Sequence, residues 1–274
     1  MILPSKVSDV AACLITAAFV CLSACQTPDR TDNPSDNNDR AQISLEEIIA
    51  KNSIALGGKE ALDSVTTMVK TSRIVEGNNR DIAVFATDRL GRMRVDIFAD
   101  GHRVFSESYD GEDAYQWSPQ DGQSAASERG TVALSHTPQL PNHIFRLKDV
   151  ASNGHSLELL GYEELDGTEY SVLKLTLSDG FENYLWVDRE SGFVVRARNT
   201  RALHVDVNDE ETVIESRISD FRTVGDIVHP HSVLEMDLKT GESLVDVSLL
   251  SIDLNVELPG GYFRDLVREV PELE

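Results

Sequence analysis

The sequence contains little cysteine, only 6% aromatic residues and no long apolar run near its N-terminus. Its three cysteines, Cys13, Cys21 and Cys25, all lie within the first 25 of 274 residues. The remainder of the chain can therefore form no disulfide, no cysteine-ligated zinc site and no cysteine nucleophile. The uncharged run from Val10 to Leu22 counts 13 residues, whereas a membrane-spanning helix needs about 20. This run is too short for a transmembrane helix.

Known catalytic signatures are also missing. The chain has no G-x-S-x-G or H-E-x-x-H sequence, no P-loop and no dinucleotide-binding fingerprint. His229 and His231 share one strand face, but a zinc site needs three or four ligands, so we interpret them as surface histidines after a turn. Residues 110–113 lack the ligand spacing of an EF-hand and indicate a hairpin turn. The sequence predicts no catalytic residue, no metal site and no enzyme activity.

Acidic residues outnumber basic residues by 47 to 25, which gives a net charge of −22. Such a charge argues against binding to nucleic acid and against electrostatic adhesion to anionic lipid heads. So many carboxylates also form close pairs by chance, so no glycosidase-like pair can be inferred from them. We expect the acidic side chains to keep the protein soluble or to complement a basic partner.

The N-terminus has the organisation of a secretory signal. Lys6 precedes the apolar run, whose length falls within the roughly 7 to 15 residues of a signal h-region. Leu22-Ser23-Ala24-Cys25 then resembles the lipobox of bacterial lipoproteins at all four positions. This resemblance predicts that residues 1–24 are removed and that Cys25 carries a diacylglycerol and an N-acyl chain such as palmitate, with no other cofactor. An ordinary signal peptide with an incidental cysteine is the alternative.

The resemblance to lipoproteins also implies a location. Two or more acyl chains anchor a protein stably, whereas one holds it only marginally. Gln26, rather than aspartate, follows the cysteine, which in such lipoproteins implies the outer membrane, facing the periplasm, over inner-membrane retention. Residues 26–42 are rich in Asp, Asn and Thr and carry no large apolar side chain. Residues 25–43 are therefore predicted to be the lipidated cysteine and a disordered tether, with a reach of roughly 20 to 25 Å.

Residues 44–274 are predicted to form one domain, mainly β with short helices (α+β). It begins with a helix, because Ser44 and Glu47 match a capping box and Gly57-Gly58 provides an end signal. A second short helical turn is expected to follow. Beyond it the apolar period changes from that of a helix to that of a strand.

Short alternating runs occupy most of this domain. One run has two distinct faces: Met93, Val95, Ile97 and Ala99 against Arg92, Arg94 and Asp96. Turn signals such as Asp100-Gly101 and Asp166-Gly167 separate the runs. We expect roughly ten strands in an antiparallel meander, arranged as a sandwich or barrel.

One segment interrupts the strands. Residues 119–138 are polar and loop-like, and residues 140–150 then indicate a short helix. The apolar positions of that helix are Ile144, Phe145, Leu147 and Val150. In a sheet protein such a helix either plugs the core or covers an opening, and a plug is slightly favoured.

Five stretches of the domain resemble one known family. In order they are IIAKNSIALGGKEALDSV, YDGEDAYQW, NYLWVDRESGFVVRA, ISDFRTVGDIVHPHSV and IDLNVELPGGYF. They are similar to the outer-membrane lipoprotein-sorting family, whose members look like the LolA and LolB carriers, and they span nearly all of residues 45–263. The resemblance implies a strongly curved, unclosed antiparallel β-barrel, or half-barrel, with helices in its concave side and a cavity for acyl chains.

Two functions follow as hypotheses. In the first, an envelope lipoprotein binds or passes on hydrophobic cargo, a lipid or lipoprotein acyl chains, in the hollow of the half-barrel. In the second, a non-catalytic envelope sensor or scaffold uses the same fold to bind a protein partner. The first requires an apolar lining, for which the candidates are Phe145, Leu147, Leu250, Ile252, Leu254 and Val256, the last four expected on one strand face. An accessible cavity favours the first hypothesis, and a filled core favours the second.

Overall fold

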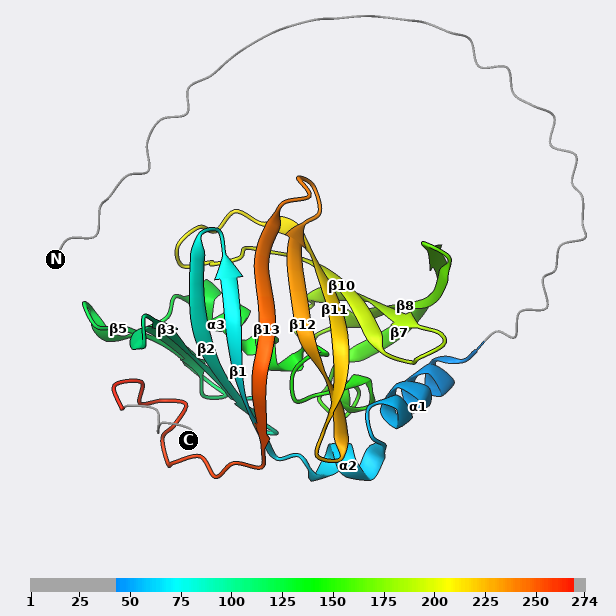
Figure 1. Ribbon diagram of the computed structural model, residues 1–274, viewed down its shortest axis with the longest axis horizontal. Coiled ribbons are helices and arrows are strands. Elements are labelled where there is room, and N and C mark those ends of the chain that lie inside the picture. Colours follow the sequence, from blue (N-terminus) through cyan, green and yellow to red (C-terminus); the bar gives the residue numbers. More distant parts are fainter. Residues whose placement is uncertain (1–42, 269–274) are drawn as a thin grey trace, which may run out of the picture. The chain divides into compact units, whose positions relative to one another are not determined.

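The described part of the chain, residues 43–268 of the computed structural model, is built around one antiparallel sheet (Figure 1). The predicted signal peptide 1–24, Cys25 and nearly all of the predicted tether lie outside the described residues, so these remain predictions. Contacts within the chain group the described residues into one unit. None of the described helices is long and apolar enough to cross a membrane.

Thirteen described strands form the sheet. Their bounds are β1 Thr67–Glu76, β2 Asn79–Asp88, β3 Met93–Ala99, β4 His102–Tyr109, β5 Ala114–Ser118, β6 Gly122–Ala125, β7 Ser156–Leu165, β8 Thr168–Thr176, β9 Glu182–Asp188, β10 Val194–Arg201, β11 Thr212–Val224, β12 Ile227–Asp237 and β13 Ser243–Leu254. Their order in the sheet is β6-β5-β4-β3-β2-β1-β13-β12-β11-β10-β9-β8-β7. All neighbours in the chain pair directly except β6 and β7, and β1 also pairs with β13. The first and last strands, β1 and β13, therefore lie side by side in the middle of the sheet. The two edge strands, β6 and β7, come from the middle of the sequence.

The sheet does not close, because its two edges, β6 and β7, are not paired with each other. The connection between them, residues 126–155, contains α3 Glu128–His136 and two 3₁₀ turns, η1 Thr137–Gln139 and η2 Leu147–Asp149. In Figure 1 this green connection lies behind β1, β13 and β12, between the two sides of the sheet. The expected unclosed half-barrel with helices in its concave side is confirmed.

The predicted N-terminal helices are both present. α1 Leu45–Ala55 starts with the expected capping box: Ser44 N donates to Glu47 Oε2 at 2.8 Å, and Glu47 N donates to Ser44 Oγ at 3.2 Å. Gly57 follows with a φ of 117°, and a Cβ there would lie 2.3 Å from the Asp226 carbonyl oxygen. Only glycine allows this approach of α1 to the β11–β12 turn. α2 Lys59–Ser64 comes next.

The segment between residues 119 and 150 differs from its prediction. Residues 122–125 form β6, and α3 follows, capped by Ser127 Oγ, which accepts from Gly130 N at 2.9 Å. A polar sequence hides this helix because only Gly130 and Leu134 of it are buried. The helix predicted at 140–150 is wrong: Arg146 is extended, with φ −127° and ψ 174°, and ends the turn before η2. The apolar residues there are spaced as on one face of a helix, but their side chains pack into two separate apolar clusters.

Hairpin turns occur where the sequence signals place them. Asp100 and Gly101 have φ of 51° and 78°, and Asp166 and Gly167 have the same pair of values. Two successive positive φ angles are the mark of the tight turns that suit a twisted hairpin, so these predictions are confirmed. The expected ten strands become thirteen.

Two apolar clusters occupy the concave side of the sheet. The Leu173 cluster comprises Ile48, Leu147, Val150, Leu173, Leu175, Leu177, Leu185, Val187, Val194, Ala197 and Ile218. The Met68 cluster comprises Leu56, Leu62, Val65, Met68, Ile144, Phe145 and Ile227. Both clusters combine sheet residues with residues of the 126–155 connection, so that connection completes the core.

The other face of the sheet is covered near β1 to β3 by the C-terminal residues. Tyr262 and Phe263 pack on Val69 and on Ala86 of β2. On β3 the predicted alternation holds, yet its polar face is buried as well: Arg94 is 1% and Asp96 is 0% exposed. Arg94 pairs with Asp96 at 2.8 Å and donates to the Tyr262 carbonyl at 3.0 Å.

Candidate functional site on the concave face

The candidate site is centred on the stretch that fills the concave side. We call residues 137–155 the inner segment. Its Ile144 and Phe145 belong to the Met68 cluster, whereas its Leu147 and Val150 belong to the Leu173 cluster. The inner segment is therefore shared by both concave clusters.

The inner segment has no strand pairing with the sheet. Apart from Thr137 N, which donates to Leu134 O of α3, its backbone-to-backbone hydrogen bonds stay within the segment among the described residues, as in His143 N to Leu140 O at 3.1 Å and Asn153 N to Asp149 O at 3.0 Å. Its other described hydrogen bonds to residues outside the segment involve a side chain, for example Ser178 N to His155 Nδ1 at 3.1 Å. The backbone of the segment is thus independent of the sheet ladder.

Four of the six predicted lining residues lie together in the concave core. Phe145 and Leu147 are buried, at 7% and 3% exposed. Ile252 and Leu254 of β13 pack against the Met68 cluster, which contains Phe145. Whether these side chains line a cargo cavity stays a prediction.

The single shared face predicted for β13 is wrong at two positions. The pairing of β13 with β1 skips Leu250, which forms a bulge and is 50% exposed. Asn255, with a φ of 59°, turns the chain after β13, and Val256 then packs with Val69 on the opposite face of the sheet. Both breaks are backbone irregularities that reset the alternation of side chains.

A small cavity lies beside the inner segment. Its volume of about 20 Å³ has room for about one water molecule and not for an acyl chain. The residues around it include Asn52, Leu56, Asn142, Arg146, Phe221 and Pro230. Two of these carry buried polar atoms with no partner, Asn52 Oδ1 and Arg146 Nε. In this arrangement the concave side is filled.

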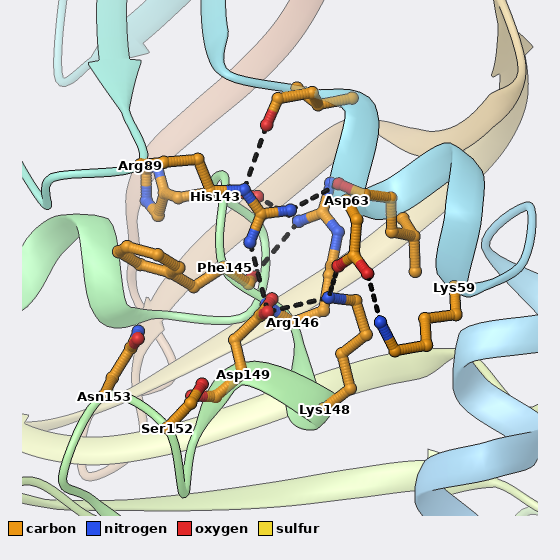
Figure 2. Close-up of polar contacts among 12 residues, drawn as sticks. Lys59, Asp63, Arg89, His143, Phe145, Arg146, Lys148, Asp149, Ser152 and Asn153 are labelled. Atoms are coloured by element: carbon orange, nitrogen blue, oxygen red, sulfur yellow. Dashed lines mark hydrogen bonds and ion pairs between the residues drawn. The ribbon is translucent and has the colours of Figure 1, made fainter.

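Ion pairs tie the η2 turn of the inner segment to α2 and to the β2–β3 turn (Figure 2). Asp149 accepts from Lys148 at 2.7 Å and from Arg89 at 3.1 Å. Lys148 also pairs with Asp63, which pairs in turn with Lys59. Hydrogen bonds from these two lysines lower the pKa of Asp63 to about 2. Both carboxylates of this group are therefore already neutralised.

Lys70 enters the concave side from β1. Its Nζ donates to the Asn142 carbonyl at 3.3 Å, lies 3.5 Å from His143 Nδ1 and sits 4.8 Å from the centre of the Phe85 ring. No ion pair of Lys70 occurs within residues 43–268. Burial lowers the pKa of Lys70 to about 7, and the positive charge of Arg146 contributes to the shift.

Arg146, on the inner segment, is 4% exposed. Its guanidinium donates to the carbonyl oxygens of Pro141, at 3.0 Å, and His143, while its backbone N–H donates to Asp149 at 2.8 Å. Burial lowers the pKa of Arg146 to about 10; Arg89 adds to this shift and Asp149 opposes it. Backbone carbonyls, and not a carboxylate, hold this guanidinium.

His229 is buried, at 2% exposed, so its interpretation as a surface histidine is wrong. It follows Ile227 of the Met68 cluster by two residues on β12 and so points to the same face. Its Nδ1–H donates to the Pro230 carbonyl at 2.7 Å, and its Nε2 has no partner. Burial, followed by the charge of Lys70, holds the pKa of His229 well below its usual value. His231 lies beside it, with ring centres 6.5 Å apart.

Lys70 and Arg146 are absent from the sequence-based candidates. A signal for Lys70 does exist: it follows Met68 by two residues, so a strand that buries Met68 also turns Lys70 inward. No comparable pattern marks Arg146, because it lies in an irregular stretch.

Comparison with known proteins finds no matching family model and no matching curated protein. Among solved structures, a LolA superfamily protein from Nitrosomonas europaea is similar, with 18% identity, a TM-score of 0.55, and coverage of 82% of this chain and 99% of that chain. The chain has a LolA-type fold. A protein described as an outer membrane lipoprotein-sorting domain, from Vibrio parahaemolyticus, matches with 12% identity and a TM-score of 0.53, over 80% of this chain and 95% of that one.

The concave site combines two apolar clusters with buried basic side chains. Neither solved structure is described as an enzyme. Across residues 43–268, no group of three or more His, Cys, Asp or Glu side chains could hold a metal ion. The site offers apolar surface and buried positive charge, which suit binding.

Proposed function

We propose that this chain is a non-catalytic binding protein of the bacterial envelope, which takes hydrophobic cargo, a lipid or lipoprotein acyl chains, into the concave side of its LolA-type half-barrel. The observation that carries the proposal is the inner segment, which completes two apolar clusters without a backbone hydrogen bond to the described sheet. Such a segment can withdraw while the sheet stays intact. Its ties to the sheet are side-chain contacts, which a bound apolar ligand can replace.

The free energy lost when the apolar side chains of the inner segment leave the core is similar to the free energy gained when an acyl chain is buried there. Burying an aliphatic or aromatic side chain stabilises a protein by about 1.5 to 3 kcal/mol, so the four apolar side chains of the inner segment contribute roughly 6 to 12 kcal/mol. An acyl chain with about twelve buried methylene groups contributes roughly 10 kcal/mol at about 0.8 kcal/mol each. Cargo can therefore replace the inner segment in the core.

The proposed place of action is the periplasmic face of the outer membrane. Cys25, the last residue of the lipobox-like sequence, would carry the acyl chains, and the following residues would tether the domain. We expect intact-mass analysis of protein from membranes to show an acylated N-terminus at Cys25, and Cys25→Ala to release the chain from the membrane fraction. An unmodified cysteine with Ala24 still attached would contradict this location.

A second candidate function is that of an envelope sensor or scaffold that binds a protein partner. The observation in its favour is the filled concave side, whose cavity of about 20 Å³ admits no acyl chain as it stands. On this account the inner segment is a permanent plug, and cargo never displaces it.

Binding of a fluorescent fatty-acyl probe separates the two functions. The chain beginning at Gln26 should bind the probe saturably, with about one site per chain. Ile252→Ala should weaken binding, because Ile252 packs on the Met68 cluster, whereas Leu250→Ala, on the same strand but half exposed, should not. No saturable binding, or equal effects of the two substitutions, would favour the scaffold.

A further inference from the structure

The concave core contains basic side chains that its fold does not neutralise. Lys70, Arg146 and His229 are buried around one part of the Met68 cluster, and His143 beside them is half-buried. Burying a cation is costly unless it is paired, and an acidic chain of net charge −22 has many carboxylates to spare. Yet none of the four makes an ion pair within residues 43–268.

The nearest carboxylates are committed to other cations. Asp149 receives hydrogen bonds from Lys148 and from the backbone of Arg146, and it pairs with Arg89. Asp63 pairs with Lys148 and, at the surface, with Lys59. On the β12 side, His231 is the remaining titratable neighbour of His229, and it is also basic. Within residues 43–268, no acidic side chain pairs with Lys70.

Two buried nitrogen atoms of this group lack any partner. His229 Nε2 and Arg146 Nε accept and donate nothing, although both residues are less than 5% exposed. The small cavity is bordered by Arg146, Asn142 and Pro230, the residue after His229. His229 Nδ1–H already donates to the Pro230 carbonyl, so Nε2 is an acceptor and offers nothing to an anion. The unpaired Arg146 Nε belongs to a residue that borders a cavity with room for about one water molecule. Lys70 is therefore the group whose missing counter-charge calls for an anion.

We propose that Lys70 of β1 binds the anionic headgroup, carboxylate or phosphate, of a single-chain lipid whose acyl chain takes the place of Ile144 and Phe145 in the Met68 cluster. This inference rests on the proposed function and names the class of its cargo.

The partners that now occupy Lys70 belong to the inner segment. Lys70 Nζ is held by the Asn142 carbonyl and lies beside His143 Nδ1, and both residues move with that segment. Withdrawal therefore uncovers apolar surface and frees the lysine together. The headgroup oxygens then replace the carbonyl as acceptors, and the ammonium gains the counter-charge that the closed site lacks.

The test compares three ligands of equal chain length: a fatty acid, an alkyl phosphate and a fatty alcohol. Titration calorimetry at pH 8.5 uses the chain beginning at Gln26 in two buffers of different ionisation enthalpy. The acid or the phosphate should bind roughly ten- to a hundredfold more tightly than the alcohol. Binding of the anion should also take up close to one proton, because its charge favours protonated Lys70, whose pKa in the closed site is about 7.

Two lysine variants supply the control. Lys70→Met should lower the affinity for the two anions to the affinity of the same variant for the alcohol, and it should abolish the proton uptake. Lys59→Met removes the same charge from a lysine that is 79% exposed. It should change neither the affinity for any of the three ligands nor the proton uptake. A preference for acid over phosphate, or the reverse, identifies the headgroup.

The failures are distinguishable. Equal affinity for acid, phosphate and alcohol without proton uptake overturns the headgroup site and leaves the proposed function standing. A preference for anions that persists in Lys70→Met also overturns it. No binding of any of the three overturns both proposals.

Discussion

At the scale of single residues, the concave site depends on side chains whose burial conflicts with their charge. Lys70 is the clearest case, because its ammonium is satisfied by a backbone carbonyl and faces an aromatic ring but no carboxylate. Its folded pKa of about 7 lies below its ordinary value of 10.5. Between these two pH values the unfolded chain therefore binds about one more proton than the folded chain. The unfolding free energy consequently rises as the pH rises through this range.

Substituting Lys70 should remove part of the dependence of the unfolding free energy on pH. Between pH 8 and pH 9.5 the unfolding free energy of the unaltered chain should rise by about 1.4 kcal/mol per pH unit more than that of Lys70→Met. Glu107, whose pKa burial raises to about 7, has largely ionised below this window. Urea unfolding at four pH values measures the slopes, and parallel lines for the two proteins would show that Lys70 does not titrate here.

Residue positions could be predicted from the sequence where local chemistry decides them. Ser44 and Glu47 form the expected capping box, and Asp100-Gly101 makes the expected turn, because the atoms involved lie within a few residues of each other. The positions of Leu250 and Val256 could not be predicted, since a bulge and one left-handed residue depend on the pairing of strands. Burial of His229 depends likewise on what covers its strand.

At the scale of elements, the inner segment is the part that the sequence describes least well. Its apolar residues are spaced as in a helix, yet it forms two short turns separated by an extended Arg146. The segment is held in place by apolar side chains that pack into two different clusters, and not by the hydrogen bonds of a helix. α3 was hidden for the opposite reason, because few of its residues are apolar and buried.

Loss of the Asp149 charge should loosen the inner segment. Asp149 accepts from the Arg146 backbone and pairs with Arg89 and Lys148, so Asp149→Asn should cost about 1 to 3 kcal/mol locally. Amide hydrogen exchange within 143–154 should then speed up while β1 and β13 keep their protection. Asp63→Asn is the matched control, because its carboxylate is 41% exposed and surface pairs contribute less than about 1 kcal/mol. Equal effects of the two substitutions would contradict this role for Asp149.

At the scale of the whole described domain, a sheet that opens between β6 and β7 creates both the concave side and its filling. The edges are consecutive strands, so the chain that joins them must cross the opening. Alternating runs and turn signals were sufficient to predict an antiparallel sheet, and the resemblance to the lipoprotein-sorting family predicted its unclosed form. Whether the concave side is hollow or filled could not be predicted, because it depends on how residues 126–155 pack.

The central claim is that cargo takes the place of the inner segment in the concave core. Amide hydrogen exchange of the chain beginning at Gln26, with and without a saturating fatty-acyl ligand, tests it most directly. We expect the bound state to show faster exchange throughout residues 137–155 and unchanged or slower exchange in β1, β12 and β13. Undiminished protection of residues 137–155 in a saturated complex would contradict the claim, since the ligand would then bind elsewhere and leave the plug in its place.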